Sequence, residues 1–501
     1  MSIATQTDRG YGATAQTVLV AVFALGVVGA LILPRGTPVW LLLLTLAGLG
    51  FQVYHEGQSS DRRGAPLIRS ALPLSGDWLT WSLLLFGGYC AINSLWSAAP
   101  LASLGKVGWL LLVVLAANLL IQIWSRLDPD TAGLLLRMLI VGFAVGAIFV
   151  LIEVLSQQSI TRAFYNTLEF MRPQLRKHMQ IEAGEVVRVF PYVTNRNVGA
   201  MHLLLWPTLL AIAVWRGGGR LKVLANSPAL LIPAGALSLL AAATLLQDLP
   251  LKGLIATFAA FALASVAFWH SMSRSGWLSA SALLLLVLVA TMPSEHESSQ
   301  IAILLSAGIF ALCTFAPTLG HRAVAAGWMA ALLGVVPAVM LANSAGLDKN
   351  VSLPLSARAR IELWHYSATE IVKHPVRGIG VDATRFIDEQ VKPSARKAGQ
   401  IFGDRPGQHS HNVYMQAWLE LGAIGVVLLL AAGLMLWRAI LRLPAPAQPF
   451  AMAAFTSAMV IGAFTWGLWQ EWYLGLFGLS LALTALGAPF AQAAVRAHRK
   501  A

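Results

Sequence analysis

Long apolar runs alternate with short polar segments along most of the chain. A helix that crosses a bilayer needs about 20 mostly apolar residues. By this criterion the sequence predicts fourteen membrane helices, near residues 16–33, 38–55, 78–96, 107–124, 132–155, 198–215, 228–246, 252–270, 276–292, 301–319, 323–341, 417–437, 450–467 and 473–494. We therefore expect an all-α polytopic membrane protein.

Composition agrees with this fold class. Hydrophobic residues make up 57% of the chain and charged residues 11%, against roughly 25% charged residues in a soluble domain. The first apolar run is long enough to remain as a membrane helix, so we expect no cleaved signal peptide. Cys90 and Cys313 both lie inside apolar runs, which predicts neither a disulfide framework nor a zinc site.

Basic residues predict the orientation of the chain. With the N-terminus in the cytoplasm, the short inner loops hold eleven Lys and Arg residues, whereas the short outer loops hold few, among them Arg35 and Lys252. This bias follows the positive-inside rule. It explains the net charge of +13 without a nucleic-acid partner. We expect both termini in the cytoplasm.

Two loops, 156–197 and 342–411, are too long to be simple connectors. In the predicted topology both lie on the outer side of the membrane. The second has a helical pattern of apolar residues that ends near Pro375. We therefore divide the chain into an N-terminal bundle of about eleven spans (1–341), a large, partly helical outer loop (342–411), and an interfacial helix with the C-terminal spans (412–501).

The segment SARARIELWHYSATEIVKHPVRGIG (356–380) is the first candidate for chemistry. Arg360 and Trp364 are four residues apart and share a helix face. Arginine suits phosphate because its planar fork makes paired, charge-assisted hydrogen bonds. The turn that holds Arg377, Gly378 and Gly380 can bring backbone N–H groups close to a ligand. The alternative is a solvated amphipathic helix.

The segment GQHSHNVYMQAWLELGAIG (407–425) is the second. A helix from Ser410 along the membrane surface would place His411, Tyr414 and Trp418 on one face. An interfacial aromatic belt would explain Tyr414 and Trp418 but not His411 with Asn412. His409 and His411 lack a nearby third ligand, so we expect no metal and no cofactor.

The third candidate is RVFPYVTNRNVGAMHLLLWP (188–207), with Arg188, Arg196 and Asn197 at the outer mouth of the sixth predicted span. The simpler alternative is that the arginines snorkel and that Asn197 caps this span. Lys252 lies in a further outer turn. Arg274 is chemically similar but falls on the cytoplasmic side of the predicted topology.

The motifs RIELW (360–364), HPVRGIG (374–380) and HSHNVYMQAWLELG (409–422) resemble, in order and spacing, the O-antigen ligase and O-antigen polymerase superfamily. The close match covers roughly residues 356–425. The resemblance implies a GT-C-like, metal-independent, inverting glycosyltransferase. Such an enzyme lies in the bacterial inner (cytoplasmic) membrane and moves a glycan from undecaprenyl diphosphate to an acceptor hydroxyl at the periplasmic face.

The resemblance also implies roles for single residues. Arg360 matches the family arginine near the diphosphate, and His411 matches the family histidine, which is either a general base or a diphosphate ligand. Arg188 and Asn197 match an earlier outer-loop motif more loosely. A second family arginine has no clean counterpart, and Lys252 and Arg274 are the alternatives. The predicted substrate-binding residues are Arg188, Arg196, Asn197, Lys252, Arg274, Trp364, Arg377, His409, Asn412 and Tyr414.

The acceptor stays open at the level of the sequence. Two basic outer loops, with Arg-x₁₀-Gly at Arg188–Gly199 and Arg396–Gly407, favour a polysaccharide polymerase over a ligase that transfers the glycan to lipid A–core. A polymerase implies work with a flippase and a chain-length regulator. A transporter of lipid-linked glycans is a further alternative. It needs ionisable residues inside the spans, where the sequence has few.

Overall fold

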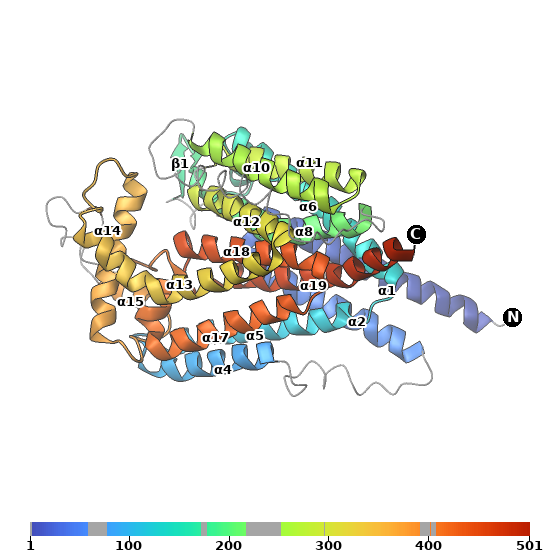
Figure 1. Ribbon diagram of the computed structural model, residues 1–501, viewed down its shortest axis with the longest axis horizontal. Helices are drawn as coiled ribbons and strands as arrows, with labels where there is room; N and C mark the ends of the chain where they lie inside the picture. The colour runs from blue at the N-terminus through green and yellow to red at the C-terminus, as the bar shows by residue number, and fades with distance from the viewer. Residues whose placement is uncertain are drawn as a thin grey trace.

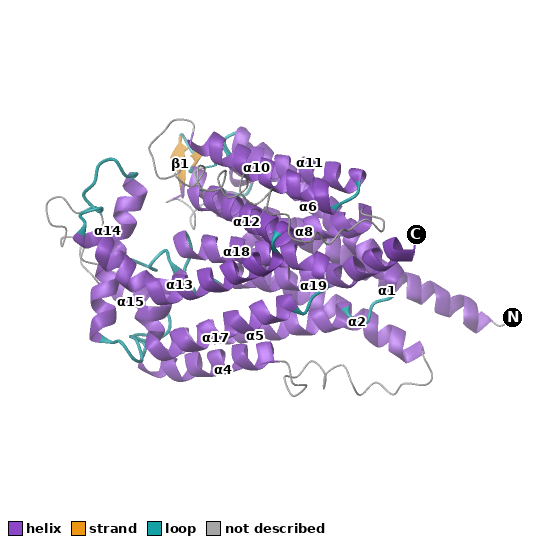
Figure 2. Cartoon of the chain, viewed as in Figure 1, coloured by secondary structure: helices purple, strands orange, loops and turns teal. Residues whose placement is uncertain are grey.

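The computed structural model describes residues 3–58, 78–171, 178–216, 252–294, 296–390, 401 and 407–500. It confirms the predicted all-α fold, as Figures 1 and 2 show: long helices lie side by side, and β1 (Met179–Glu182) and β2 (Glu185–Val189) form a small antiparallel hairpin. Eleven of the described helices are long and apolar enough to cross a membrane.

The first half of the bundle begins at the N-terminus and packs α1 against α2 and α6. Its helices are α1 (Ile3–Ile32), α2 (Thr37–Gln58), α4 (Trp78–Asn93), α5 (Pro100–Trp124), α6 (Pro129–Leu155), α7 (Ser159–Thr167) and α8 (Asn195–Arg216). Proline opens α5 and α6 because its missing N–H is not needed in the first helical turn. Asp128 caps α6 by accepting from the Thr131 N–H at 2.8 Å.

In the second half, α12 packs against both α10 and α18, and α19 against α5 and α8. The helices are α10 (Lys252–Ser271), α11 (Arg274–Thr291), α12 (Glu297–Phe315), α13 (Pro317–Ser344), α14 (Leu355–Lys373), α15 (Ala383–Gln390), α16 (Val413–Gln416), α17 (Gly422–Leu441), α18 (Gln448–Phe464) and α19 (Glu471–Lys500). A π-helical turn, Ala417–Leu421, joins α16 to α17. Helix α19 therefore ties the C-terminal spans to the N-terminal bundle.

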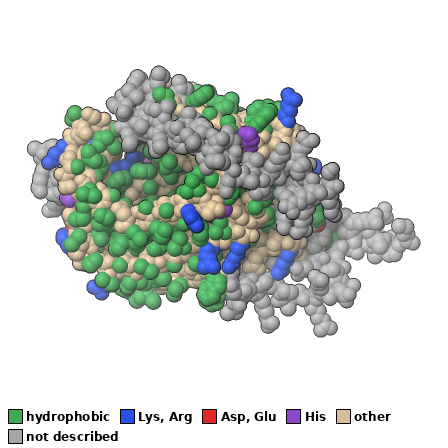
Figure 3. All heavy atoms as spheres, viewed as in Figure 1, with side chains coloured by type: hydrophobic (Ala, Val, Ile, Leu, Met, Phe, Trp, Pro, Cys, Tyr) green, Lys and Arg blue, Asp and Glu red, His purple; other side chains and the backbone are tan. Residues whose placement is uncertain are grey.

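Thirteen of the fourteen predicted spans coincide with helices. The remaining one, 228–246, lies outside the described residues. Helix α4 has 16 residues, short for a bilayer crossing. Apolar side chains cover much of the face seen in Figure 3, and many on the long helices are exposed, as expected of contact with lipid.

The two long predicted loops are folded. Segment 156–197 contains α7 and the β-hairpin, which the sequence did not predict, and segment 342–411 contains α14, which it did. In Figure 1, α14, α15 and the hairpin lie at one end of the bundle, and both chain ends lie at the other. This arrangement agrees with the predicted orientation, in which the long loops and the termini face opposite sides.

Candidate functional site

The candidate site is a hollow between the α14 segment and the main bundle. Figure 3 shows basic side chains recessed in it. Five parts of the chain meet there: α14, the segment 407–412 before α16, the loop 465–470 between α18 and α19, and the N-terminal ends of α8 and α12. These parts are far apart in sequence, so the bundle itself assembles the site.

His411 lies in a fixed, unusual conformation at this hollow. Its φ is +50°, and its Nδ1 is 2.9 Å from the carbonyl oxygen of Thr465. A carbonyl only accepts, so Nδ1 carries the proton and donates it. Among the described residues none hydrogen-bonds Nε2, which is therefore a bare nitrogen able to accept a proton.

The electrostatic surroundings keep His411 neutral. Burial lowers its pKa, the hydrogen bond to Thr465 opposes that effect, and the positive charge of Arg360 lowers the pKa further. Its neighbour His409, with ring centroids 4.1 Å apart, has its pKa lowered to about 3 by burial and then by His411 and Arg196. Both imidazoles are thus uncharged at neutral pH.

Arg360 faces this neutral histidine from α14. Its guanidinium is partly buried and lies near enough to lower the pKa of both His411 and His296. Burial lowers the pKa of Arg360, and attraction to Glu297, at the start of α12, raises it. Ser356 Oγ also donates to Glu297, at 3.3 Å. The start of α12 therefore holds the α14 arginine over the hollow.

Arg196 brings a second cation to the same region. It stands in the first turn of α8, with its Cζ 5.9 Å from the centre of the Trp472 ring, and its buried Nε has no hydrogen-bond partner among the described residues. Its charge lowers the pKa of His409, and Arg35, between α1 and α2, repels it. Arg196 near His409 and Arg360 near His411 together suit a ligand with more than one negative charge.

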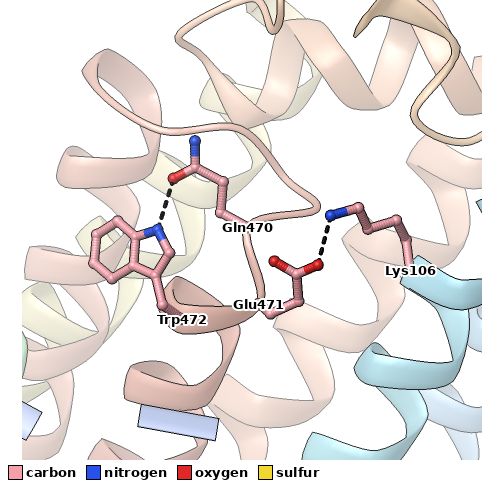
Figure 4. Close-up of polar contacts among 4 residues, drawn as sticks. All are labelled: Lys106, Gln470, Glu471 and Trp472. Carbon is pink, nitrogen blue, oxygen red and sulfur yellow. Dashed lines mark hydrogen bonds and ion pairs between the residues drawn. The ribbon is translucent and has the colours of Figure 1, made fainter. Parts of the chain in front are cut away.

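The start of α19 fixes the surface beneath Arg196. Figure 4 shows that Gln470 Oε1 accepts from the Trp472 indole, at 3.0 Å, while Glu471 turns away and pairs with Lys106 of α5. Trp472 also packs edge-on against Trp466, with ring centroids 4.4 Å apart. The loop 465–470 and the start of α19 are therefore tied to α5 as well as to each other.

The turn at 378–380 (GIG) is hydrogen-bonded to the segment 419–422, which contains the ELG motif, and does not face a ligand. We call this contact between the two segments the lock. The Ile379 and Gly380 N–H groups donate to the carbonyls of Leu419 and Glu420, at 3.0 and 2.9 Å. Gly378 has φ +67°, and a Cβ there would collide with the Glu420 carbonyl. The prediction that these N–H groups approach a ligand is wrong, because backbone carbonyls already use them.

The side chain of Glu420 connects the lock to neighbouring segments through hydrogen bonds. Its buried carboxylate accepts from the backbone N–H and hydroxyl of Thr384, the Asp382 N–H, the Gln416 amide and the Trp469 indole. Five donors satisfy a charge that burial would otherwise make costly. Gln416 and Trp469 connect the same carboxylate to the segments that hold His411 and Thr465.

Three predicted ligands, Arg274, Arg377 and Arg188, do not lie with Arg360 and Arg196. Arg274 is exposed at the start of α11. This helix has 18 residues and is about 27 Å long, and Thr291 at its other end is hydrogen-bonded to His202. Arg377 is exposed, 5.6 Å from the Trp96 ring centre, and Arg188 is exposed on β2, 5.8 Å from that of Phe190. Arg274 is therefore dropped as a ligand. The side chain of Lys252 lies outside the described residues.

Other predicted ligands hold the fold. Tyr414 is a buried core residue whose hydroxyl donates to Met459 O, at 2.9 Å. Asn197 Nδ2 donates to the Leu31 and Ile32 carbonyls, so it caps the end of α1, and the prediction that it caps its own helix is wrong. The Trp364 indole donates to Ser410 O, at 2.6 Å, and orients the segment before His411.

The predicted surface helix from Ser410 is also corrected. Asn412 accepts from the N–H groups of Tyr414 and Met415, so it is the N-cap and the helix begins at Val413. His411 lies outside the helix and shares no helix face with Tyr414. The cap explains why asparagine follows the histidine: it starts the helix and leaves His411 in the loop that faces the hollow.

The sequence analysis missed several residues of the site. Arg35 was counted only for orientation, and neither His296 nor Thr465 was singled out. Thr465 contributes a backbone carbonyl, which leaves no signal in the sequence. Arg35 and His296 stand at the ends of spans, and only the packing of these spans brings them to the hollow. Among the described residues no group of three or more His, Cys, Asp and Glu is placed to hold a metal ion.

Comparisons with known proteins support the family resemblance. Residues 259–430 match the family model described as O-antigen ligase. Proteins of Rickettsia conorii and Rickettsia prowazekii, with the provisional name polysaccharide ligase, are 27% and 25% identical to this chain over 128 residues. These matches cover 25% of this chain and 31% of each relative. A Rickettsia bellii protein with the same provisional name is 25% identical over 38% of the chain and 47% of its own length.

Proposed function

Since residues 259–430 match the O-antigen ligase family, we propose that this chain is a polysaccharide ligase of the bacterial inner membrane. It transfers a glycan from undecaprenyl diphosphate to an acceptor hydroxyl, such as one on lipid A–core. The observation that carries the proposal is the pairing of Arg360 with a neutral His411, whose Nδ1 is held by Thr465 and whose Nε2 has no hydrogen bond from the described residues.

The largest requirement of the reaction is stabilisation of the negative charge on the leaving group. As the bond between the sugar C1 and the phosphate oxygen breaks, negative charge builds on the lipid diphosphate that leaves. Arg360 on one side and Arg196 with Arg35 on the other are the cations available to it. One well-placed donor of this kind contributes ~2.7–4 kcal/mol to the transition state.

His411 acts as the general base. The acceptor oxygen attacks C1 from the face opposite the diphosphate, its proton passes to Nε2, and the configuration at C1 inverts. The lowered pKa of His411 favours this role over that of a cationic diphosphate ligand, because the imidazole is neutral at the working pH. General-base help of this kind is worth ~10²–10⁴-fold in rate.

The comparisons favour a ligase over a polymerase, which the sequence analysis had placed first. The family description and the relatives' names both say ligase. Packing also accounts for the glycine of the Arg188–Gly199 pattern, because a Cβ at Gly199 would collide with the Trp466 ring. Arg396, of the second pattern, lies outside the described residues.

The membrane determines where the site and the lipid-linked donor lie. Helix α14, which borders the hollow, lies at the end of the bundle opposite both termini (Figure 1), and in our proposal this end is the periplasmic face. The polyprenyl chain of the donor lies along the apolar spans, and the diphosphate stays at their outer ends. A flippase delivers this donor, and a chain-length regulator acts before transfer.

Deletion of the gene, with separation of the lipid-linked glycans by mass, tests the proposal. A ligase predicts full-length chains stranded on undecaprenyl diphosphate and an acceptor without glycan. Single repeat units with no long chains would instead indicate a polymerase. An unchanged set of lipid-linked glycans would contradict both.

A further inference from the structure

Thr465 joins two hydrogen-bond systems at the base of the site. Its carbonyl accepts from His411 Nδ1, at 2.9 Å, and its hydroxyl pairs with Ser298 Oγ from the first turn of α12. Ser298 Oγ also lies 3.1 Å from His296 Nε2, and His296 Nδ1 lies 2.6 Å from Ser299 Oγ. A continuous chain of polar contacts thus runs from the start of α12 to the proposed catalytic histidine.

This chain is sheltered from water. Ser298 and His296 are each 3% exposed and Ser299 is fully buried. The His296 ring stacks on Trp466, the residue after Thr465, with centroids 5.2 Å apart and planes 27° apart. Buried polar atoms that all have partners hold one geometry, because every alternative leaves a group unpaired.

His296 stays neutral in this setting. Burial lowers its pKa to about 3, with further lowering by His202 of α8 and Arg360 of α14. A neutral imidazole accepts at one nitrogen and donates at the other, so it satisfies Ser298 and Ser299 together. Its neutrality keeps the contact with Ser298 constant over the pH range in which His411 would work.

Thr465 lies at the end of α18, where a small displacement of its backbone would change the orientation of its carbonyl. It follows Phe464, the last residue of α18, and the backbone leaves helical geometry there, with φ −129° and ψ −53°. Apolar packing joins α12 and α18 along their length. The Ser298–Thr465 hydroxyl pair is therefore not needed to hold the two helices together, and its evident effect is on the orientation of Thr465.

We propose that Ser298, supported by His296, is a positioning residue for glycan transfer: it holds the Thr465 hydroxyl so that the Thr465 carbonyl keeps His411 in its Nδ1-protonated form with Nε2 toward the acceptor. This inference rests on the proposed function, because it assigns Ser298 and Thr465 to the base of that reaction. In this proposal both residues act through His411 and need not touch the substrate.

The test compares Thr465→Val with Thr465→Ser in the full-length protein reconstituted in membranes. Valine keeps the shape and the backbone carbonyl but removes the hydroxyl, and serine keeps the hydroxyl. We expect Thr465→Val and Ser298→Ala each to lower kcat about 10- to 100-fold, as misplacement of a catalytic group does, with KM for the donor unchanged. Thr465→Ser should retain most of the wild-type kcat.

The pH profile gives a second readout. Groups that face His411 and His409 are Arg360 of α14 and Arg196 of α8. Because the Thr465 hydrogen bond raises the pKa of His411, a weaker bond should move the acid limb of kcat to lower pH. The double variant Ser298→Ala/Thr465→Val should lose no more activity than either single variant, since Ser298→Ala and Thr465→Val remove the same contact.

A matched control is Thr456→Val, which makes the same change at a buried threonine of α18 whose hydroxyl bonds only within its helix, to Met452 O. It should leave kcat and the pH profile as in the wild type. Wild-type kcat and an unmoved acid limb in Thr465→Val and Ser298→Ala, with His411→Gln inactive, would overturn the inference and leave the proposed function standing. Transfer by His411→Gln at the wild-type rate would overturn the proposed function itself.

Discussion

Arg360→Gln is the substitution that probes the proposed electrostatics most fully. Arg360 is partly buried, is attracted by Glu297, and acts on both His411 and His296. Glutamine keeps hydrogen-bonding capacity at similar length but removes the charge. If the guanidinium stabilises the diphosphate as it leaves, kcat should fall ~10²–10³-fold, which corresponds to ~2.7–4 kcal/mol.

The same substitution should also change the pH dependence, and the sign can be worked out. The Arg360 charge lowers the pKa of His411. Its removal therefore raises that pKa, and the acid limb of kcat should move to higher pH. This shift is opposite to the one expected for Thr465→Val, so the two variants separate the effect of the cation from that of the hydrogen bond.

The assay is glycan transfer by the reconstituted protein, followed as kcat and KM from about pH 5 to pH 9. Lys373→Gln is the matched control, because it removes a cation from the same helix, at an exposed position paired with Glu370. The control should retain wild-type activity. An Arg360→Gln protein with less than a fivefold loss and an unmoved acid limb would refute the proposed role of this arginine.

Three further predictions concern the base, the lock and the topology. His411→Gln should lower kcat ~10²–10⁴-fold with little change in KM for the donor, and an equal loss in His409→Gln would contradict the assignment of one base. Gly422→Ala should destabilise the protein, because Gly422 has φ +63° and a Cβ there would collide with the Val376 carbonyl; an unchanged melting temperature in detergent would argue against the lock. An engineered cysteine at exposed Ser352 should react with an impermeant thiol reagent from the periplasm, and reaction only after inner-membrane disruption would overturn the topology.

The sequence predicted the bundle well because membrane helices are encoded locally. A run of about 20 apolar residues has few alternatives in a bilayer, and thirteen of the predicted spans therefore coincide with helices. Helix α14 was predicted for the same kind of reason, from the spacing of Ile361, Trp364, Ala368 and Ile371 on one face. The β-hairpin at 179–189 was missed because its short strands, among polar residues, carry a weak pattern.

The candidate site was harder to predict because tertiary packing assembles it. His411 and Arg360 were named from their motifs, but the carbonyl that orients His411 belongs to Thr465, 54 residues later in the chain. The GIG turn was interpreted as a ligand cradle, since the sequence does not show that its N–H groups meet Leu419 and Glu420. Tyr414, for its part, is buried against Trp328, a partner from a distant helix.

The most direct test of the central claim is transfer by the purified full-length protein in vesicles that contain an undecaprenyl-diphosphate-linked glycan and lipid A–core. We expect the wild type to join the whole glycan to the core and to release undecaprenyl diphosphate in equal amount, and we expect Arg360→Gln and His411→Gln to do neither at a comparable rate. Wild-type protein that lengthens the lipid-linked glycan and leaves the core unmodified, or transfer that is indifferent to both substitutions, would contradict it.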